Sequence, residues 1–216
     1  MNRRSFLTIA LALWFGASAN GAAPADSPRI GFLTPLPDSG PDREGFRQGL
    51  RELGYVEGKN ILIDWRRGET AQELRSLADA VVKGKVKVIV TSGAPPTKAA
   101  MQSTATIPVV FVDVGDPVAG GFAASLARPG RNGTGVSVVA TELYPKRLEL
   151  LHRLAPKARR ITCLLNSSHP LTARYLEEME RAARTLDIRL QTLDARDTRE
   201  LEPCCSLWPR SRLRRF

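Results

Sequence analysis

Aromatic residues and cysteines are scarce in this chain of 216 residues, and its body has no long apolar stretch. Aromatic side chains make up 6% of the residues, which argues against a surface that stacks nucleic acid bases. Three cysteines are too few for a disulfide scaffold. The one long apolar stretch, Phe6 to Phe15, is shorter than the ~20 residues of a membrane-spanning helix. With 43% hydrophobic residues, the chain can form one compact domain or two small lobes.

The net charge of +10 suggests nucleic acid binding at first sight, but much of it lies at the two ends of the chain. Six of the 32 basic residues are Arg3, Arg4, Arg210, Arg212, Arg214 and Arg215. The rest of the chain is only mildly basic, which is a weak reason to expect a phosphate partner. We therefore expect no nucleic acid partner. The alternative is a basic tail, Arg210 to Arg215, that touches nucleic acid or anionic lipid.

The first 19 residues have the pattern of an export signal. Arg3 and Arg4 precede the apolar stretch, and Ala17-Ser18-Ala19 offers a small-x-small cleavage site. The arginine pair is typical of a twin-arginine leader, and a general secretory signal is the alternative. Both predict a periplasmic protein, and the shortness of the apolar stretch argues against a membrane anchor.

From Arg29 onward, short β-rich runs alternate with helical patterns. One amphipathic helix is expected to bury Phe46, Leu50 and Leu53, which are spaced by four and three residues. Strands separated by single helices need crossover connections, which predict a parallel sheet with helices on both faces. Strands are expected at residues 29–34, 61–65, 86–90, 108–112 and 136–139. After residue 140 the pattern restarts, with strands at 161–165 and 188–193 and helices at 143–154 and 171–186.

Residue types that are common in catalytic and metal sites are present, but their spacing matches no known catalytic or metal-binding motif. The stretch Gly54 to Asn60 imitates a phosphate loop, but its glycine spacing is short and it follows a helix, so we interpret it as a helix end and turn. Ser92, His169 and Asp116 could be imagined as a triad, yet no Gly-x-Ser-x-Gly elbow occurs. Cys163 lies in an apolar strand, as a small buried residue would. We expect no enzyme activity, cofactor or metal.

Candidate binding residues follow the carboxyl ends of the predicted strands, where open α/β sheets hold their ligands. Ser92, Gly93 and Ala94 begin a helix whose N–H groups favour an anion such as a carboxylate. An acidic side chain beside that helix start, such as Asp116, would suit the amino group of a solute. Each of these loops has an alternative interpretation as turn and capping chemistry. The candidates are Thr34, Pro35, Leu36, Ser92, Gly93, Ala94, Asp116, Pro117 and Asn166.

Three segments carry a family resemblance over about Arg29 to Asp197. They are Gly45 to Asn60, Ile107 to Phe111 and, most specifically, Gly115 to Gly135 (GDPVAGGFAASLARPGRNGTG). Leu165-Asn166 adds a strand that ends in Asn. The chain resembles the ABC transporter substrate-binding proteins of the family that includes tryptophan and tyrosine binders.

The resemblance implies an α/β protein with two Rossmann-like, flavodoxin-like lobes of the periplasmic binding protein type I fold. These lobes would close on a small solute, such as an amino acid, for delivery to an ABC permease in the inner membrane. It also implies a monomer without catalysis. We expect a signal at 1–19, an N-terminal lobe at 28–140, a partial second lobe at 141–201 and an irregular basic tail at 202–216.

The chain departs from the family near its end. The family pattern stops soon after Leu201, and Pro203 to Phe216 has four arginines, no acidic residue and no helical or strand period. We therefore expect a truncated or frameshifted member with an incomplete second lobe and weak or absent ligand binding. The alternatives are a non-functional gene fragment and an exported α/β enzyme without a recognisable motif.

Overall fold

The computed structural model describes residues 27–36, 41–138 and 142–206. The predicted export signal at 1–19 and residues 207–216 of the predicted tail lie outside these ranges. The elements, in chain order, are β1 (Arg29–Thr34), α2 (Pro41–Glu52), β2 (Leu62–Arg67), α3 (Ala71–Lys83), β3 (Val88–Ser92), α4 (Ala94–Ser103), β4 (Val109–Val114), β5 (Gly133–Ser137), α5 (Leu143–Leu154), β6 (Arg160–Leu165), α6 (Thr172–Thr185), β7 (Arg189–Asp194) and α7 (Thr198–Ser206). Among the described residues, no helix combines the length and the apolar character needed to cross a membrane.

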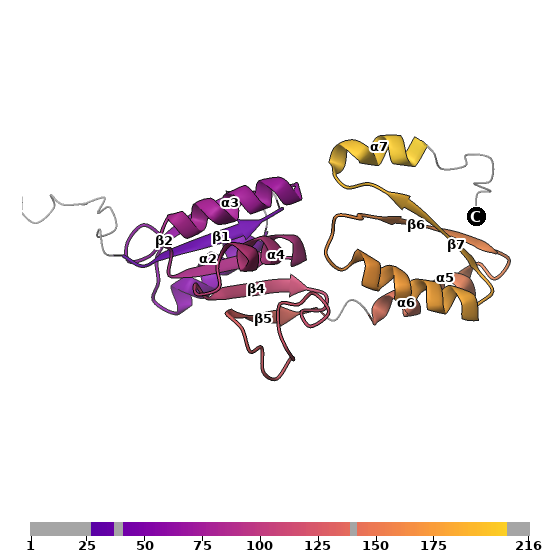
Figure 1. The fold of residues 1–216 in the computed structure, drawn as a ribbon, viewed down its shortest axis with the longest axis horizontal. Helices are drawn as coiled ribbons and strands as arrows, with labels where there is room; N and C mark the ends of the chain where they lie inside the picture. The colour runs from indigo at the N-terminus through magenta and orange to yellow at the C-terminus, as the bar shows by residue number, and fades with distance from the viewer. Residues whose placement is uncertain (1–26, 37–40, 139–141, 207–216) are drawn as a thin grey trace, which may run out of the picture.

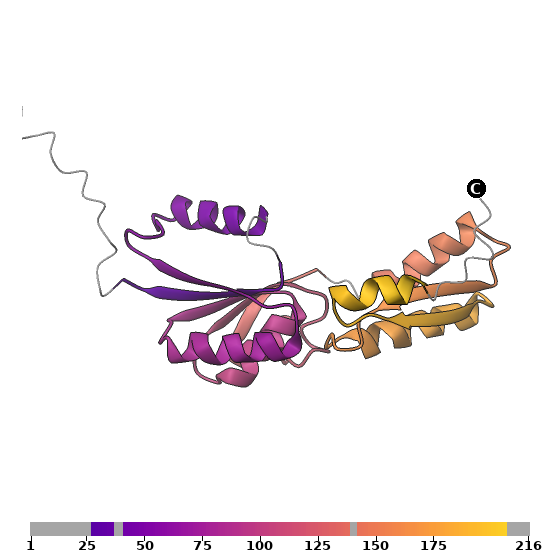
Figure 2. The same cartoon turned by 90° about the horizontal axis from the view of Figure 1, so that it is seen from above.

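The first lobe, residues 27–138, is a five-stranded parallel sheet in the order β2-β1-β3-β4-β5. Helices α3 and α4 lie on one face of the sheet and α2 lies on the other (Figure 1 and Figure 2). This arrangement confirms the α/β fold with helices on both faces. Its core is made of buried aliphatic side chains from the strands and from α3, among them Leu33, Leu74, Val81, Ile89 and Val109.

Helix α2 is held to the sheet by a small aromatic cluster. The ring of Phe46 lies 5.1 Å from that of Phe32 and 6.0 Å from that of Trp65, measured between centroids. Arg47 lies over the Trp65 ring at 4.8 Å, a cation–π contact. The expected burial of Leu53 is wrong, because this side chain is 75% exposed just beyond the end of the helix.

The fifth strand lies earlier in the chain than expected. It spans Gly133–Ser137 instead of residues 136–139, and its first three residues pair with β4. A Cβ atom on Gly135 would lie 1.8 Å from the carbonyl oxygen of Phe111. The strand therefore approaches β4 through glycine, a residue whose presence does not reveal a strand in the sequence pattern.

Gly31 is a position in the core of the first lobe where an added methyl group is expected to destabilise the fold. A Cβ atom there would lie 2.2 Å from Cγ1 of Val81, which is fully buried in α3. Gly31→Ala should lower the free energy of unfolding by about 1–3 kcal/mol through overpacking. Urea denaturation measures this effect. Gly49→Ala is the matched control, because nothing lies within 4 Å of its added Cβ atom and helix propensity favours alanine. Equal urea midpoints for the two variants would contradict the prediction.

The second lobe, residues 142–206, is much thinner. Its sheet consists of β6 and β7 alone, paired in parallel. Helices α5 and α6 pack against it through a small core of Leu148, Ala183 and Ile188, with four partly buried apolar neighbours. No side chain within β6 or β7 is fully buried. The described part of this lobe thus has far less apolar packing than the first lobe.

The expectation of an irregular segment from residue 202 is wrong for its first five residues. They complete helix α7, which contains Pro203 as its sixth residue. Proline removes only one helical hydrogen bond, and α7 is anchored at its start, where Asp197 accepts hydrogen bonds from the backbone N–H groups of Arg199 and Glu200.

Candidate functional site

Three of the predicted loops lie side by side in the first lobe. Thr34 ends β1, Ser92 ends β3, and Asp116 follows β4 by two residues. Strands β1, β3 and β4 are consecutive neighbours in the sheet, so these residues share its carboxyl edge. Thr34 and Ser92 are buried, with 2% and 3% of their surface exposed.

The start of helix α4, directly after β3, offers fewer backbone N–H donors than expected from the sequence. Gly93 caps α4 with a φ of 89°, a backbone conformation that favours glycine. Pro95 and Pro96 lack N–H groups, so Ala94 is the one residue of the first three in α4 that has a backbone donor. An anion at this point would find little of the usual support of a helix N-terminus.

Asp116 shapes the loop that follows β4. Its Oδ1 atom accepts hydrogen bonds from the backbone N–H groups of Val118 (3.1 Å) and Ala119 (2.9 Å). One carboxylate oxygen of Asp116 therefore caps the turn, which is the alternative interpretation given for this loop. Pro117 is buried behind this turn. Thr34 has a similar local role, since its Oγ1 atom accepts from the N–H group of Leu36 at 3.0 Å.

Asn166 ties together two loops of the second lobe. Its side-chain nitrogen donates to the carbonyl of Arg196 at 3.0 Å. Its Oδ1 atom accepts from the backbone N–H (2.8 Å) and the hydroxyl (2.6 Å) of Ser168. These bonds join the loop after β6 to the segment after β7, so Asn166 organises the carboxyl edge of the second sheet.

The two lobes meet through α6. Leu171, directly before α6, is fully buried in one cluster with Phe111, Val114 and Phe122 of the first lobe, and Tyr175 packs against this cluster. Burial raises the pKa of Tyr175 to about 12, with smaller contributions from Tyr144, Asp116 and Asp113. The loop of Asp116 therefore lies near α6, and the predicted residues of the two lobes are on facing sides of the molecule.

His169 and Cys163 lie close to this contact. The His169 ring lies 5.8 Å from that of Tyr175, and its Nδ1 atom accepts the N–H of Leu171 at 3.2 Å. Burial lowers the pKa of His169, which favours the neutral ring. Cys163 is only half-buried, so the expectation of a buried cysteine is wrong. Both residues line a cavity of about 230 Å³ within the second lobe.

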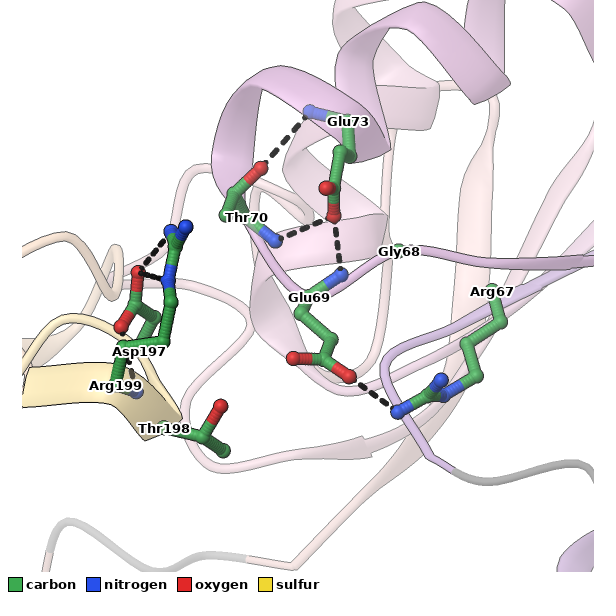
Figure 3. Close-up of a pocket in the computed structure, with 8 residues that line it drawn as sticks. All are labelled: Arg67, Gly68, Glu69, Thr70, Glu73, Asp197, Thr198 and Arg199. Atoms are coloured by element: carbon green, nitrogen blue, oxygen red, sulfur yellow. Dashed lines mark hydrogen bonds and ion pairs between the residues drawn. The ribbon is translucent and has the colours of Figure 1, made fainter. Parts of the chain in front are cut away.

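A larger cavity of about 530 Å³ lies between the lobes, at the starts of α3 and α7 (Figure 3). Apart from Gly68, its lining residues are polar or charged, and they come from both lobes. They are Arg67, Gly68, Glu69, Thr70, Glu73, Asp197, Thr198 and Arg199.

The charges around this cavity are largely paired within each lobe (Figure 3). Arg67 pairs with Glu69, and Arg199 pairs with Asp197 at 2.6 Å. Hydrogen bonds from the N–H groups of Glu69 and Thr70 hold the pKa of Glu73 below its ordinary value, and Arg199 of the other lobe adds a small part. A polar opening of this kind can admit a small charged or zwitterionic solute.

Sequence reasoning missed the residues of the larger cavity. One signal was available, because Thr70 and Glu73 have the spacing of a capping box, and the structure contains that box. This pattern places a helix start, but it does not indicate that a second lobe faces it.

Comparison with known proteins places the chain in a family. The sequence profile of the family described as ABC transporter substrate-binding protein matches residues 37–209. A tyrosine-binding protein of Clostridioides difficile (strain R20291) is 34% identical over 140 residues, which are 64% of this chain and 40% of that protein.

Two solved structures show the same fold. A conserved domain protein of Vibrio cholerae O1 biovar El Tor superposes with a TM-score of 0.73 at 24% identity, over 82% of this chain and 60% of that one. A protein of Streptococcus pneumoniae, described as an ABC domain in complex with L-Trp, superposes with a TM-score of 0.71 at 23% identity and the same coverage. The chain thus spans about 40% of the curated relative's length and 60% of the two solved chains. With its profile match over most of the chain, the protein belongs to the ABC transporter substrate-binding protein family.

Proposed function

We propose that this chain is the solute-binding component of an ABC-type importer and that it takes up a small solute, such as an amino acid, between its lobes. The observation that carries the proposal is the facing of the two carboxyl edges, with Asp116 of the first lobe near α6 of the second. The relatives support the ligand class, since one is a tyrosine-binding protein and one was solved with L-Trp.

The proposed site consists of the residues expected from the strand ends. The first lobe contributes Thr34 to Leu36, Ser92 to Ala94 and Asp116-Pro117, and the second contributes Asn166. Family members are typically extracytoplasmic. We propose export to the periplasm through the signal at residues 1–19 and delivery of the solute to an inner-membrane permease.

Affinity is expected to be weak because the described part of the second lobe has two strands and little apolar packing. A ligand held between lobes gains affinity only if both walls are ordered, and ordering a loose wall consumes part of the binding free energy. We therefore expect dissociation constants of about 1 mM, which corresponds to about 4 kcal/mol of binding free energy.

Titration calorimetry of the purified chain with L-tyrosine, L-tryptophan and L-leucine tests the proposal. We expect saturable heat from at least one of the three and none from their deaminated acids, which lack the amino group that Asp116 would bind. Equal heats from the amino acids and the deaminated acids would contradict a site that recognises an amino acid.

A further inference from the structure

We propose that Thr97, with the help of Thr91, is a positioning residue of the proposed solute site. Its hydroxyl holds the carbonyl of Gly93 and thereby aims the N–H group of Ala94 at the carboxyl edge of the first sheet. The inference rests on the proposed function, because it concerns what keeps one loop of that site in shape. Neither threonine belongs to the candidate residues that follow the strand ends.

Buried hydroxyl groups are concentrated at this edge. In the described part of the chain, the buried polar side chains are Thr34, Thr91, Ser92 and Thr97. They lie in the last two positions of β1 or β3 or in the first half of α4. Both Thr91 and Thr97 are 0% exposed. Burying a hydroxyl costs free energy unless it is hydrogen-bonded, and valine would fill the same volume without that cost. These two hydroxyls therefore point to a role that an aliphatic side chain could not fill.

The hydroxyls of Thr91 and Thr97 form a directed chain of hydrogen bonds. The Oγ1 atom of Thr97 donates to the carbonyl of Gly93 at 2.7 Å. The Oγ1 atoms of Thr91 and Thr97 are 2.8 Å apart. A hydroxyl has one proton, so Thr97, which gives its own to Gly93, accepts from Thr91. The chain thus runs from Thr91 through Thr97 to Gly93, and bonds in such a chain strengthen one another.

Gly93 is held at both of its backbone groups. Its N–H group donates to the carbonyl of Val112 in β4 at 2.9 Å. Its carbonyl accepts the N–H group of Thr97 at 3.4 Å as well as the hydroxyl of Thr97 at 2.7 Å. As a glycine at the N-cap of α4, it has no side chain that could bond the first turn. The shorter bond, from the Thr97 hydroxyl, is therefore the main hold on this carbonyl.

The direction of the Ala94 N–H group follows from that hold. The carbonyl of Gly93 and the N–H of Ala94 belong to one trans peptide unit, so they point in opposite directions. The carbonyl points along α4 towards Thr97, and the N–H therefore points out of the helix start. The first N–H group of a helix has no partner within its helix. Because Pro95 and Pro96 have no N–H, Thr97 orients the one backbone donor that the first three residues of α4 can offer to a carboxylate.

NMR signals of the labelled chain test the positioning without any solute. The carbonyl-carbon signal of Gly93 should move upfield in Thr97→Val, because its carbonyl loses a hydrogen bond, and the Ala94 amide signal should move with it. Both should return in Thr97→Ser, which keeps the hydroxyl. The matched control is Ser103→Ala, since the Ser103 hydroxyl donates to the carbonyl of Ala99, four residues earlier in the same helix, at 3.1 Å. This control should leave the Gly93 and Ala94 signals in place.

The replacement Thr91→Val keeps the test decisive if Thr97→Val does not fold. It removes the outer link of the chain only, so it should move the Gly93 and Ala94 signals in the same direction by a smaller amount. Circular dichroism checks that each variant keeps its fold. Unchanged Gly93 and Ala94 signals in the folded threonine-to-valine variants would overturn the proposal.

Titration with L-tryptophan, followed by amide signals, separates this inference from the proposed function. We expect a dissociation constant at least about fivefold higher for Thr97→Val than for the wild type, and wild-type affinity for Thr97→Ser and Ser103→Ala. Equal affinities of Thr97→Val and the wild type, with the Gly93 signal moved, would overturn the role in solute binding. No binding by the wild type would contradict the proposed function, whereas the Gly93 and Ala94 signals would still decide whether Thr97 orients this peptide.

Discussion

Amide exchange in urea is expected to show two unfolding steps, with the second lobe opening first. In its described residues, 142–206, the second lobe has two strands, neither with a fully buried side chain, and a core of three buried residues. A two-stranded sheet is at best marginal without further packing. We expect the second lobe to open at a cost below about 2 kcal/mol, against at least about 5 kcal/mol for the first.

Exchange followed by mass spectrometry at rising urea concentrations resolves the two lobes. Peptides from β6 and β7 should lose protection well before peptides from β1, β3 and β4. A variant at the inter-lobe contact, Leu171→Ala, should widen the gap between the two steps, because Leu171 is buried in a cluster of the first lobe. Loss of protection at one urea concentration throughout would show a single cooperative unit and would contradict the expectation.

Replacement of Asp116 by alanine is expected to remove measurable solute binding. The carboxylate lies at the carboxyl edge of β4, and its Oδ1 atom is used by the N–H groups of Val118 and Ala119. The second oxygen can accept a hydrogen bond from the amino group of a solute. A hydrogen bond between charged groups contributes about 1.5–3 kcal/mol, so affinity should fall roughly 10- to 100-fold.

Asp116→Asn separates charge recognition from loop structure. Asparagine keeps an oxygen that can cap the turn, but it has no negative charge. Calorimetric titration with L-tryptophan should therefore show a loss of affinity in both variants. Wild-type affinity in the asparagine variant with loss in the alanine variant would show that Asp116 acts only as a turn cap.

The strands of the first lobe could largely be predicted, because most of them are short apolar runs that can be recognised from neighbouring residues in the sequence. Strand β1 lies where expected, since a buried parallel strand is a continuous apolar run. Strand β5 was displaced because its ladder begins in Gly133 to Gly135, where no side-chain period exists. Pro203 likewise suggested the end of structure, whereas contacts at the start of α7 carry the helix past it. Local pattern fails where pairing with a distant segment decides the conformation.

The candidate site also has one part that could be predicted from the sequence and one part that could not. The carboxyl-edge rule locates Thr34, Ser92 and Asp116, because strand direction follows from the alternation of strands and helices. The inter-lobe contact of Tyr175 and the charged cavity of Arg67, Glu73 and Arg199 depend on how the lobes face each other. The spacing of residues in a single sequence does not indicate how two lobes are placed relative to each other.

Amide chemical-shift mapping of the labelled chain titrated with L-tryptophan tests directly where a solute binds. Binding between the lobes predicts that the largest shifts fall on Ser92 to Ala94, on Asp116 and its turn, and on Asn166, and that they saturate together. Shifts that gather on α2 or on the outer face of α5, or that never saturate, would contradict the proposed site.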